Sequence, residues 1–170
     1  MHRLCSLLLG ISLLAPAALH GQEPPLWLRT PAISPDGRTL AFSYQGNLYR
    51  VPAAGGTAVP LTLGEAHAFM PVWSPDGKWL AFASDRSGNF DVYLMPAEGG
   101  AARRLTFHAS QDLPSAFTAD GKAILFTSGR LAPATYALFP ARGSPETYTV
   151  PVGGGAARMV TPTPLQAGVF

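Results

Sequence analysis

One sequence pattern occurs three times in the chain, and this repeat constrains the fold more than any other feature. The copies read PAISPDGRTLAF then NLYRVPAAGGTAVPLT, PVWSPDGKWLAF then DVYLMPAEGGAARRLT, and SAFTADGKAILF then ETYTVPVGGGAARMVT. In every copy an Asp precedes a Phe by 6 positions and a Tyr precedes a Thr by 13, and the Asp-Gly turns recur every 40 to 44 residues. Such constant spacing is typical of a repeat architecture with one structural unit per copy.

One junction within the repeat changes its length. The Phe and the Tyr of each copy are 7, 11 and 22 positions apart in the first, second and third copies. Insertions concentrate in surface loops, where the chain tolerates extra residues. The variable junctions are therefore predicted to be loops on one rim of the structure.

Each copy predicts four short antiparallel strands. In the first copy one strand ends at Ile33, and three more cover residues 39–44, 47–51 and 58–62. The residues Ser-Pro-Asp-Gly suit a tight turn, because Pro presets φ, the Asp side chain hydrogen-bonds to its own backbone and Gly accepts a positive φ. The 18 glycines and 17 prolines would break a helical bundle, but they fit strands and tight turns. Both strand faces are small or apolar, as in a sheet covered on both sides.

Four antiparallel strands at this period predict β-propeller blades. The predicted fold class is all-β, an incomplete β-propeller of three four-stranded antiparallel blades after an N-terminal signal peptide. Propellers usually close with about 4–8 blades, so the chain is interpreted as a fragment that exposes a blade face and self-associates when isolated. A three-blade protein is the alternative. The expected segments are a signal peptide (1–21), a lead-in (22–30), blade 1 (31–62), linker and blade 2 (63–106), linker and blade 3 (107–161, with an insertion at 129–146) and the start of a truncated fourth blade (162–170).

The first 21 residues have the pattern of a secretory signal peptide. A short basic start precedes an apolar run from Leu4 to Leu14, and small residues follow before the chain turns polar. The run is too short for a membrane span. Cleavage after Ala17 or Gly21 removes the single Cys5, so an exported periplasmic or extracellular protein without a thiol or a membrane span is expected. The formal net charge of +2 argues against a nucleic-acid partner.

The repeat resembles the TolB-type propeller repeats of exported bacterial proteins over about residues 26–161. Leu28–Gly56, Phe69–Gly100 and Glu146–Gly155 are most similar to the N-terminal propeller of exported tricorn-like serine proteases. This resemblance implies a non-catalytic propeller that gates or channels peptide or protein substrates toward a serine nucleophile in the catalytic region of the parent protein, with the remaining blades as its neighbours. A TolB-like protein-binding scaffold, or the propeller of a prolyl-oligopeptidase-like hydrolase, is the alternative.

No catalytic, cofactor-binding or metal-binding residue is assigned from the sequence, and no cofactor is expected. The G-x-S-x-G motif of hydrolase nucleophiles is missing. Ser115, His108 and Asp112 lie close in sequence, but nearness in sequence does not make a triad. His67 and His108 occupy similar linkers and could meet near one rim, although hydrogen-bonded or solvated histidines are the preferred interpretation.

Three further patterns have structural interpretations. Gly153–Ala156 is a hairpin turn without the lysine of a phosphate-binding loop. The segment Asp85–Asp91 lacks the closing glutamate of a calcium loop, and an Asp85–Arg86 or Arg86–Asp91 contact is expected instead. Three aspartates recur with the turn, and each is expected to serve its own turn: Asp36, Asp76 and Asp120. Three arginines are expected to shield an outer edge strand or to line a basic strip for peptide carboxylates: Arg103, Arg104 and Arg158.

Overall fold

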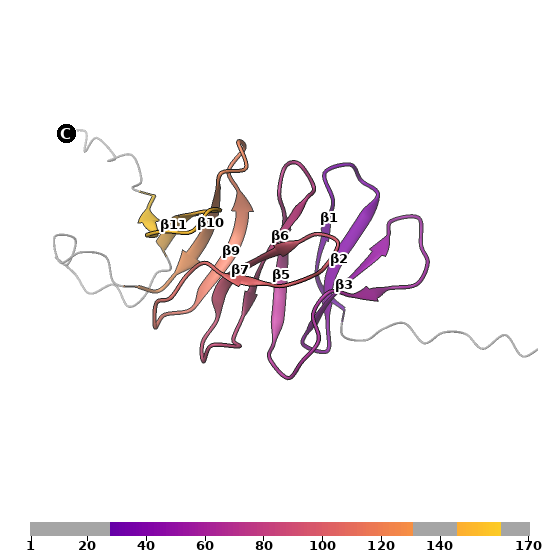
Figure 1. The fold of residues 1–170 in the computed structure, drawn as a ribbon, viewed down its shortest axis with the longest axis horizontal. Helices are drawn as coiled ribbons and strands as arrows, with labels where there is room; N and C mark the ends of the chain where they lie inside the picture. The colour runs from indigo at the N-terminus through magenta and orange to yellow at the C-terminus, as the bar shows by residue number, and fades with distance from the viewer. Residues whose placement is uncertain (1–27, 131–145, 161–170) are drawn as a thin grey trace, which may run out of the picture.

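The computed structural model describes residues 28–130 and 146–160. These residues form three four-stranded antiparallel sheets, one for each repeat (Figure 1). The predicted all-β class and the incomplete three-blade propeller are confirmed. The expected signal peptide, the truncated fourth blade and most of the third-copy insertion lie outside the described residues. Within the described ranges no helix is long and apolar enough to cross a membrane.

The strands follow the repeat closely, and each blade ends in a very short outer strand. Every sheet runs in sequence order from its first strand to its fourth. β1 starts two residues before the expected blade boundary, and β11 starts at the last residue assigned to the insertion. The bounds are β1 Arg29–Ile33, β2 Thr39–Tyr44, β3 Asn47–Pro52, β4 Val59–Pro60, β5 Ala68–Trp73, β6 Trp79–Ser84, β7 Asp91–Pro96, β8 Arg103–Arg104, β9 Asp112–Phe117, β10 Ala123–Ser128, β11 Glu146–Pro151 and β12 Arg158–Met159.

The Asp-Gly turn between the first two strands of each blade is a closed hydrogen-bond unit. In blade 1 the Ser34 hydroxyl donates to Asp36 Oδ1 at 2.5 Å and accepts the Thr39 N–H at 2.9 Å. The Arg38 N–H donates to the same Asp36 oxygen at 3.1 Å, and Gly37 has a φ of 71°. The second and third copies repeat this unit around Asp76 and Asp120. Each aspartate therefore serves its own turn, as the sequence predicts.

Because of these turns, the free energy of unfolding is expected to depend on pH in the acid range. The Ser or Thr hydroxyl, followed by a backbone N–H, holds the pKa of Asp36, Asp76 and Asp120 below the ordinary value of 3.8. Because the unfolded chain binds protons more tightly at these carboxylates, their contribution is present above that value and is lost as the pH falls through the lower folded pKa. Denaturant unfolding between about pH 2 and 6 should show this loss.

An Asp→Asn change at all three turns is expected to flatten that acid limb, because the amide oxygen still accepts the same hydrogen bonds but does not titrate. Removing the donors by Ser34→Ala, Ser74→Ala and Thr118→Val keeps the carboxylates and should shift the limb toward higher pH. An acid limb that stays the same in both variants would contradict this account.

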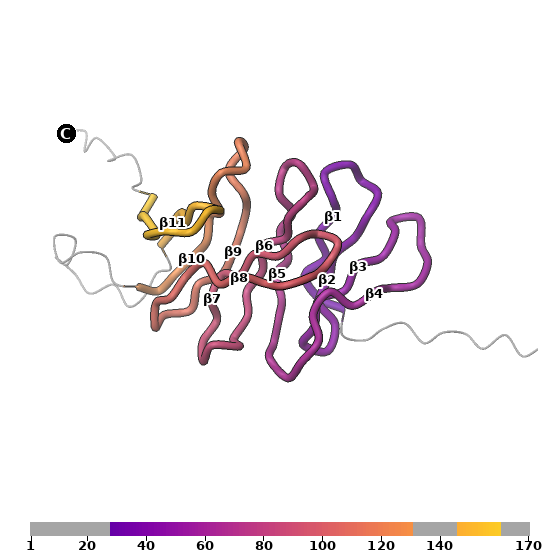
Figure 2. Tube along the Cα trace, in the orientation of Figure 1, coloured from indigo at the N-terminus to yellow at the C-terminus, as the bar shows by residue number. Residues whose placement is uncertain are grey.

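The blades stack face to face around their first strands, β1, β5 and β9 (Figures 1 and 2). Between blades 1 and 2, the small Ala41 and Leu48 pack in one cluster with Leu80 and the larger aromatic Phe82 and Tyr93. Between blades 2 and 3 the same pairing of small against large side chains repeats. One face of each blade therefore presents aromatic rings, and the opposite face of the preceding blade receives them.

The two outermost faces have no blade against them within the described residues. Alternate residues of a strand point to opposite faces, so Phe42 and Tyr49 of blade 1 point away from blade 2. Thr127 and Thr149 of blade 3 likewise point away from its neighbour. The end faces thus carry the two halves of the same large-against-small pattern.

Candidate functional site

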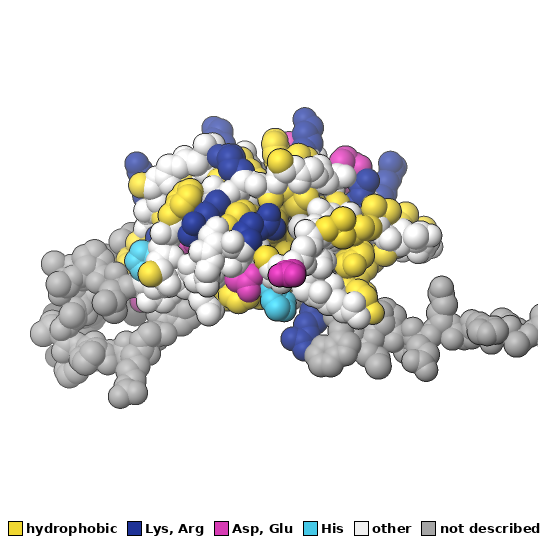
Figure 3. Space-filling model, turned by 60° about the horizontal axis from the view of Figure 1, so that its bottom comes forward, with side chains coloured by type: hydrophobic (Ala, Val, Ile, Leu, Met, Phe, Trp, Pro, Cys, Tyr) yellow, Lys and Arg dark blue, Asp and Glu magenta, His cyan; other side chains and the backbone are white. Residues whose placement is uncertain are grey.

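The two rims of the stacked blades carry different kinds of loop. The three Asp-Gly turns lie along the upper edge of Figure 1. The opposite edge, here called the linker rim, holds the linkers between blades (residues 61–67 and 105–111) and the loops between second and third strands (residues 45–46 and 85–90). The variable junctions of the first two copies, after β2 and β6, fall on this rim, as predicted. Figure 3 turns this lower edge forward and shows basic, acidic and histidine side chains interspersed with apolar ones.

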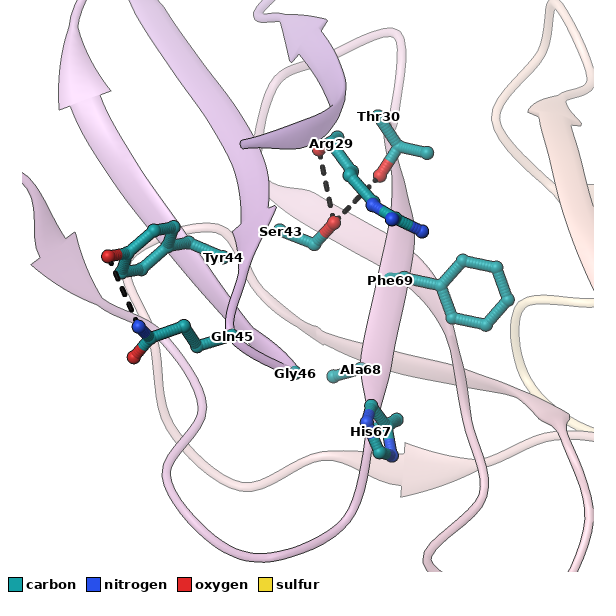
Figure 4. Close-up of a pocket in the computed structure, with 9 residues that line it drawn as sticks. All are labelled: Arg29, Thr30, Ser43, Tyr44, Gln45, Gly46, His67, Ala68 and Phe69. Atoms are coloured by element: carbon teal, nitrogen blue, oxygen red, sulfur yellow. Dashed lines mark hydrogen bonds between the residues drawn. The ribbon is translucent and has the colours of Figure 1, made fainter. Parts of the chain in front are cut away.

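A cavity of about 720 Å³ opens at the linker rim beside the inner strands of blades 1 and 2. Its wall comes from the start of β1, the end of β2, the tight turn after β2 and the start of β5 (Figure 4). It has the size of a small-ligand pocket, about 300–1,000 Å³. The lining residues are Arg29, Thr30, Ser43, Tyr44, Gln45, Gly46, His67, Ala68 and Phe69.

Two inner-strand bulges shape the wall of this cavity. Thr30 and Met70 occupy equivalent positions and have φ values of 46° and 54°, in the left-handed region that residues other than glycine rarely adopt. Each precedes a proline that donates no N–H to the ladder, and the register shifts there. The Met70 N–H donates to Thr30 Oγ1 at 3.1 Å, which joins the two bulges. Such strain persists only where the surroundings enforce it, often at binding sites.

Polar contacts order the mouth of the cavity. The Ser43 hydroxyl donates to the Arg29 carbonyl at 3.1 Å and lies 3.1 Å from Thr30 Oγ1. The His67 N–H donates to Asp85 Oδ1 at 2.8 Å, and its ring Nδ1 lies 3.6 Å from Asp85 Oδ2. Gly46, with a φ of 80°, passes so close to this ring that a Cβ would stand 3.2 Å from it. The arrangement offers hydroxyls, an amide and an imidazole beside the Phe69 ring.

Two buried carboxylates lie at the interface between blades 2 and 3, and the repeat pattern does not predict their pairing. Asp91 Oδ2 accepts a hydrogen bond from Arg104 Nη2 at 2.6 Å, and its other oxygen accepts one from the Thr106 hydroxyl at 3.2 Å. Burial raises the pKa of Asp91, although the Arg104 charge and these hydrogen bonds oppose the shift. Asp112 Oδ2 pairs with Arg130 Nη2 at 2.5 Å, while its Oδ1 has no partner among the described residues.

The residues considered for a nucleophilic triad each have other partners. The Ser115 hydroxyl donates to the Leu125 carbonyl at 3.2 Å, and His108 Nδ1 accepts the Ser110 N–H at 3.0 Å. Asp112 is held by Arg130. The two histidines in the described ranges have different neighbours, Asp85 for His67 and the Ser110 N–H for His108. No cluster of three or more potential metal ligands occurs in that part of the chain.

The expected contact of Arg86 with Asp85 or Asp91 is wrong. Asp85 is held by the His67 backbone, and Asp91 is paired with Arg104. Arg86 instead donates from Nε to Ser84 Oγ at 3.1 Å. The two loop acids therefore do not converge on a calcium site in the described structure.

The outer arginines do not form one strip. Arg103 donates to the carbonyls of Val152 and Gly153, so it fastens the third-blade turn that includes Gly153–Ala156. Its neighbour Arg104 points to Asp91 and stacks over Phe107. Arg158 is exposed on the edge strand β12. Successive residues of a strand face opposite sides, which separates the first two guanidinium groups.

Four-stranded blades stacked around their inner strands, with a cavity at the linker rim, define a β-propeller. The model of the tricorn protease N-terminal beta propeller domain matches residues 25–158. The chain belongs to this family.

Individual relatives support the same class of fold. A segment of 69 residues is 39% identical to an uncharacterized peptidase, YuxL, of Bacillus subtilis (strain 168), and it covers 35% of this chain and 10% of that protein. A structure described as TolB from Agrobacterium tumefaciens is similar with a TM-score of 0.65 and 28% identity, over 80% of this chain and 47% of that one. A tricorn protease structure is similar with a TM-score of 0.54 and 16% identity, over 73% and 13%. The chain thus spans less than half of each of these relatives.

Proposed function

We propose that this chain is the non-catalytic N-terminal propeller part of an exported tricorn-like serine peptidase, and that it gates or channels peptide substrates. Its partners are then the peptides, the remaining blades and a catalytic region elsewhere in the parent protein. The match to the tricorn propeller family supports the assignment to such a parent. The cavity beside the inner strands is the observation that carries the role in substrate access.

The chemistry of the cavity suits a peptide. Peptide-binding sites need an apolar surface for side chains and a few fixed polar groups for the backbone. Phe69 supplies a ring that packs edge-on against Phe90 with centroids 4.9 Å apart. Thr30, Ser43 and Gln45 supply hydroxyl and amide groups around it. The joined bulges hold this wall in place without a ligand, which limits the entropy lost on binding.

A TolB-like protein-binding scaffold is the second candidate. The TolB structure has both a higher TM-score and a higher identity than the tricorn structure. A propeller of a prolyl-oligopeptidase-like hydrolase is the third, and similarity to a puromycin hydrolase at 19% identity and a TM-score of 0.58 shows the fold alone.

Photo-cross-linking tests the proposed role directly. Short unstructured peptides that carry a photoreactive phenylalanine are expected to label the walls of the cavity, at Arg29–Thr30 and Ala68–Phe69. Phe69→Ala should weaken labelling because the ring is the main apolar contact, whereas the control Leu63→Ala changes an exposed residue of the same rim outside the cavity. Peptide hydrolysis by this chain should stay at background. Labelling confined to the outer strands, or equal labelling of Phe69→Ala and wild type, would rule out the channel.

A further inference from the structure

Two arginines of the linker rim occupy the same place in successive blades. Arg86 and Arg130 each follow a serine by two positions and donate from Nε to its hydroxyl at 3.1 Å. Each guanidinium lies over a stacked Phe–Tyr pair of its own blade. The guanidinium carbon is 5.5 and 4.7 Å from the two ring centroids for Arg86, and 5.1 and 4.9 Å for Arg130. The two side chains therefore present their remaining N–H groups in the same way.

The residue that faces each arginine differs between the two blades. Asp112 pairs with Ser128 in the β9–β10 ladder and gives Arg130 its carboxylate. Ala68 pairs with Ser84 in the β5–β6 ladder, so it holds the equivalent position beside Arg86. Both residues donate their N–H at 2.7 Å to a carbonyl in the preceding blade, of Gly46 for Ala68 and of Phe90 for Asp112. A methyl group thus stands in blade 2 where blade 3 has a carboxylate.

Nothing in the described ranges takes the place of that missing carboxylate. No ion pair with Arg86 occurs there, and the adjacent Asp85 is directed at His67. Ala68 also lines the cavity, together with Arg29 and His67 and without any Asp or Glu among the lining residues. Figure 4 shows Ala68 between Gly46 and Phe69 on this wall. The cavity thus reaches Ala68, while Arg86 lies outside its lining and is exposed to solvent.

We propose that Arg86 and Ala68 form a carboxylate-binding site between blades 1 and 2, in which a carboxylate of the ligand replaces the side chain that Asp112 provides in blade 3. Arginine suits this role because its planar guanidinium pairs with carboxylates in a fixed geometry. If the chain channels peptides as proposed above, the ligand carboxylate comes from a peptide C-terminus or from an Asp or Glu side chain. The site then holds the acidic end of a peptide while the Phe69 side of the cavity contacts its neighbouring residues.

The test uses the full chain and follows the Arg86 Nε–H signal by NMR while acetate or peptides are added. Acetate is expected to shift this signal with a millimolar dissociation constant, and a peptide acid should bind at least tenfold more tightly than acetate. Amidation of a peptide without acidic side chains should remove this gain if the C-terminus is the source. A peptide with an internal glutamate and an amidated end should keep it if a side chain is the source.

Two variants separate the site from general effects of charge. Ala68→Asp supplies the carboxylate from within the chain, so it should abolish the response to acetate and raise the melting temperature. Ala68→Asn, of the same size but neutral, should do neither. Arg86→Gln changes an exposed residue and should lose carboxylate binding, followed in this variant by the backbone amide signals of Ala68 and Ser84, without loss of folding. It keeps the test decisive if Ala68→Asp does not fold.

The outcomes also separate this proposal from the proposed function. Equal binding of acidic and fully amidated neutral peptides, or undiminished binding of acetate by Arg86→Gln, would overturn the carboxylate site and leave the channel in place. A response of Arg86 to acetate without any peptide labelling of the cavity would support the site and count against the channel.

Discussion

Replacing Phe82 by alanine is expected to lower the free energy of unfolding by about 3–5 kcal/mol, the range for a buried phenylalanine. Phe82 is fully buried and lies in the core between blades 1 and 2. Its ring stacks on Tyr93 with centroids 5.9 Å apart and lies beneath Arg86. Alanine would leave a cavity at the blade interface, which the stacked sheets could close only by moving closer together and disturbing their other contacts. Denaturant titration followed by circular dichroism measures the loss.

Phe42 is the matched control, because it is the same residue of the repeat in blade 1. Its ring also stacks on a tyrosine, Tyr49, with centroids 5.9 Å apart, but it faces away from blade 2. Phe42 is also largely buried, at 9% exposure, but Phe42→Ala opens no cavity between the described blades. A smaller loss of about 1.5–3 kcal/mol, the value for burying one such side chain, is therefore expected. Equal losses for the two variants would mean that the interface between blades contributes nothing specific.

The repeat was sufficient to predict the architecture because its turns and strands use local chemistry. Asp36 and Gly37 act within a few residues of their own positions, and the Asp-Gly turn therefore has the same form in all three blades. The range Thr39–Tyr44 was predicted to the residue. The predicted fourth strand, residues 58–62, is shorter in the structure, at Val59–Pro60. Outer strands pair on one side only, so sequence pattern defines their ends weakly.

The cavity could not be predicted in the same way, because it depends on two bulges that oppose local preference. A residue before proline ordinarily favours extended backbone, whereas Thr30 and Met70 adopt a positive φ. The contact between the two inner strands, in which the Met70 N–H donates to Thr30 Oγ1, joins these two residues across the blade interface. The prolines at positions 31 and 71 were the available signal, since proline within a strand indicates a bulge or an edge.

The buried ion pairs were missed because they are the part of the structure that does not repeat. Asp112 corresponds to Ala68, and Asp91 corresponds to Asn47, which accepts a hydrogen bond from Thr62 at 3.2 Å. Comparing the copies shows what they share and therefore passes over a pair of charges that occurs once. Glu146 corresponds to Asp91 in the third copy, but Met159 stands where Arg104 does. The 15-residue spacing from Asn47 to Thr62, and from Asp91 to Thr106, could have identified the hydroxyl partner, although not Arg104.

Arg130→Met is expected to cost about 3–5 kcal/mol of unfolding free energy, because removing one partner of a buried ion pair leaves the other charge uncompensated. The Asp112 side chain is fully buried, and Arg130 supplies its one hydrogen bond in the described structure. Methionine keeps much of the apolar stem of arginine but offers no N–H. Thermal and denaturant unfolding of the variant measure the loss against wild type.

Arg86→Met is the control, since this arginine has an equivalent serine and an equivalent pair of stacked rings in blade 2 but no carboxylate partner in the described ranges. It should cost about 0.5–1 kcal/mol, the value of an exposed cation–π contact. Adding Asp112→Ala to Arg130→Met removes the stranded charge and is expected to restore much of the lost stability, because an ion pair replaced as a whole is less costly than one that is broken. If the double variant were no more stable than Arg130→Met, the loss would come from packing at Arg130, and the pairing with Asp112 would not be its cause.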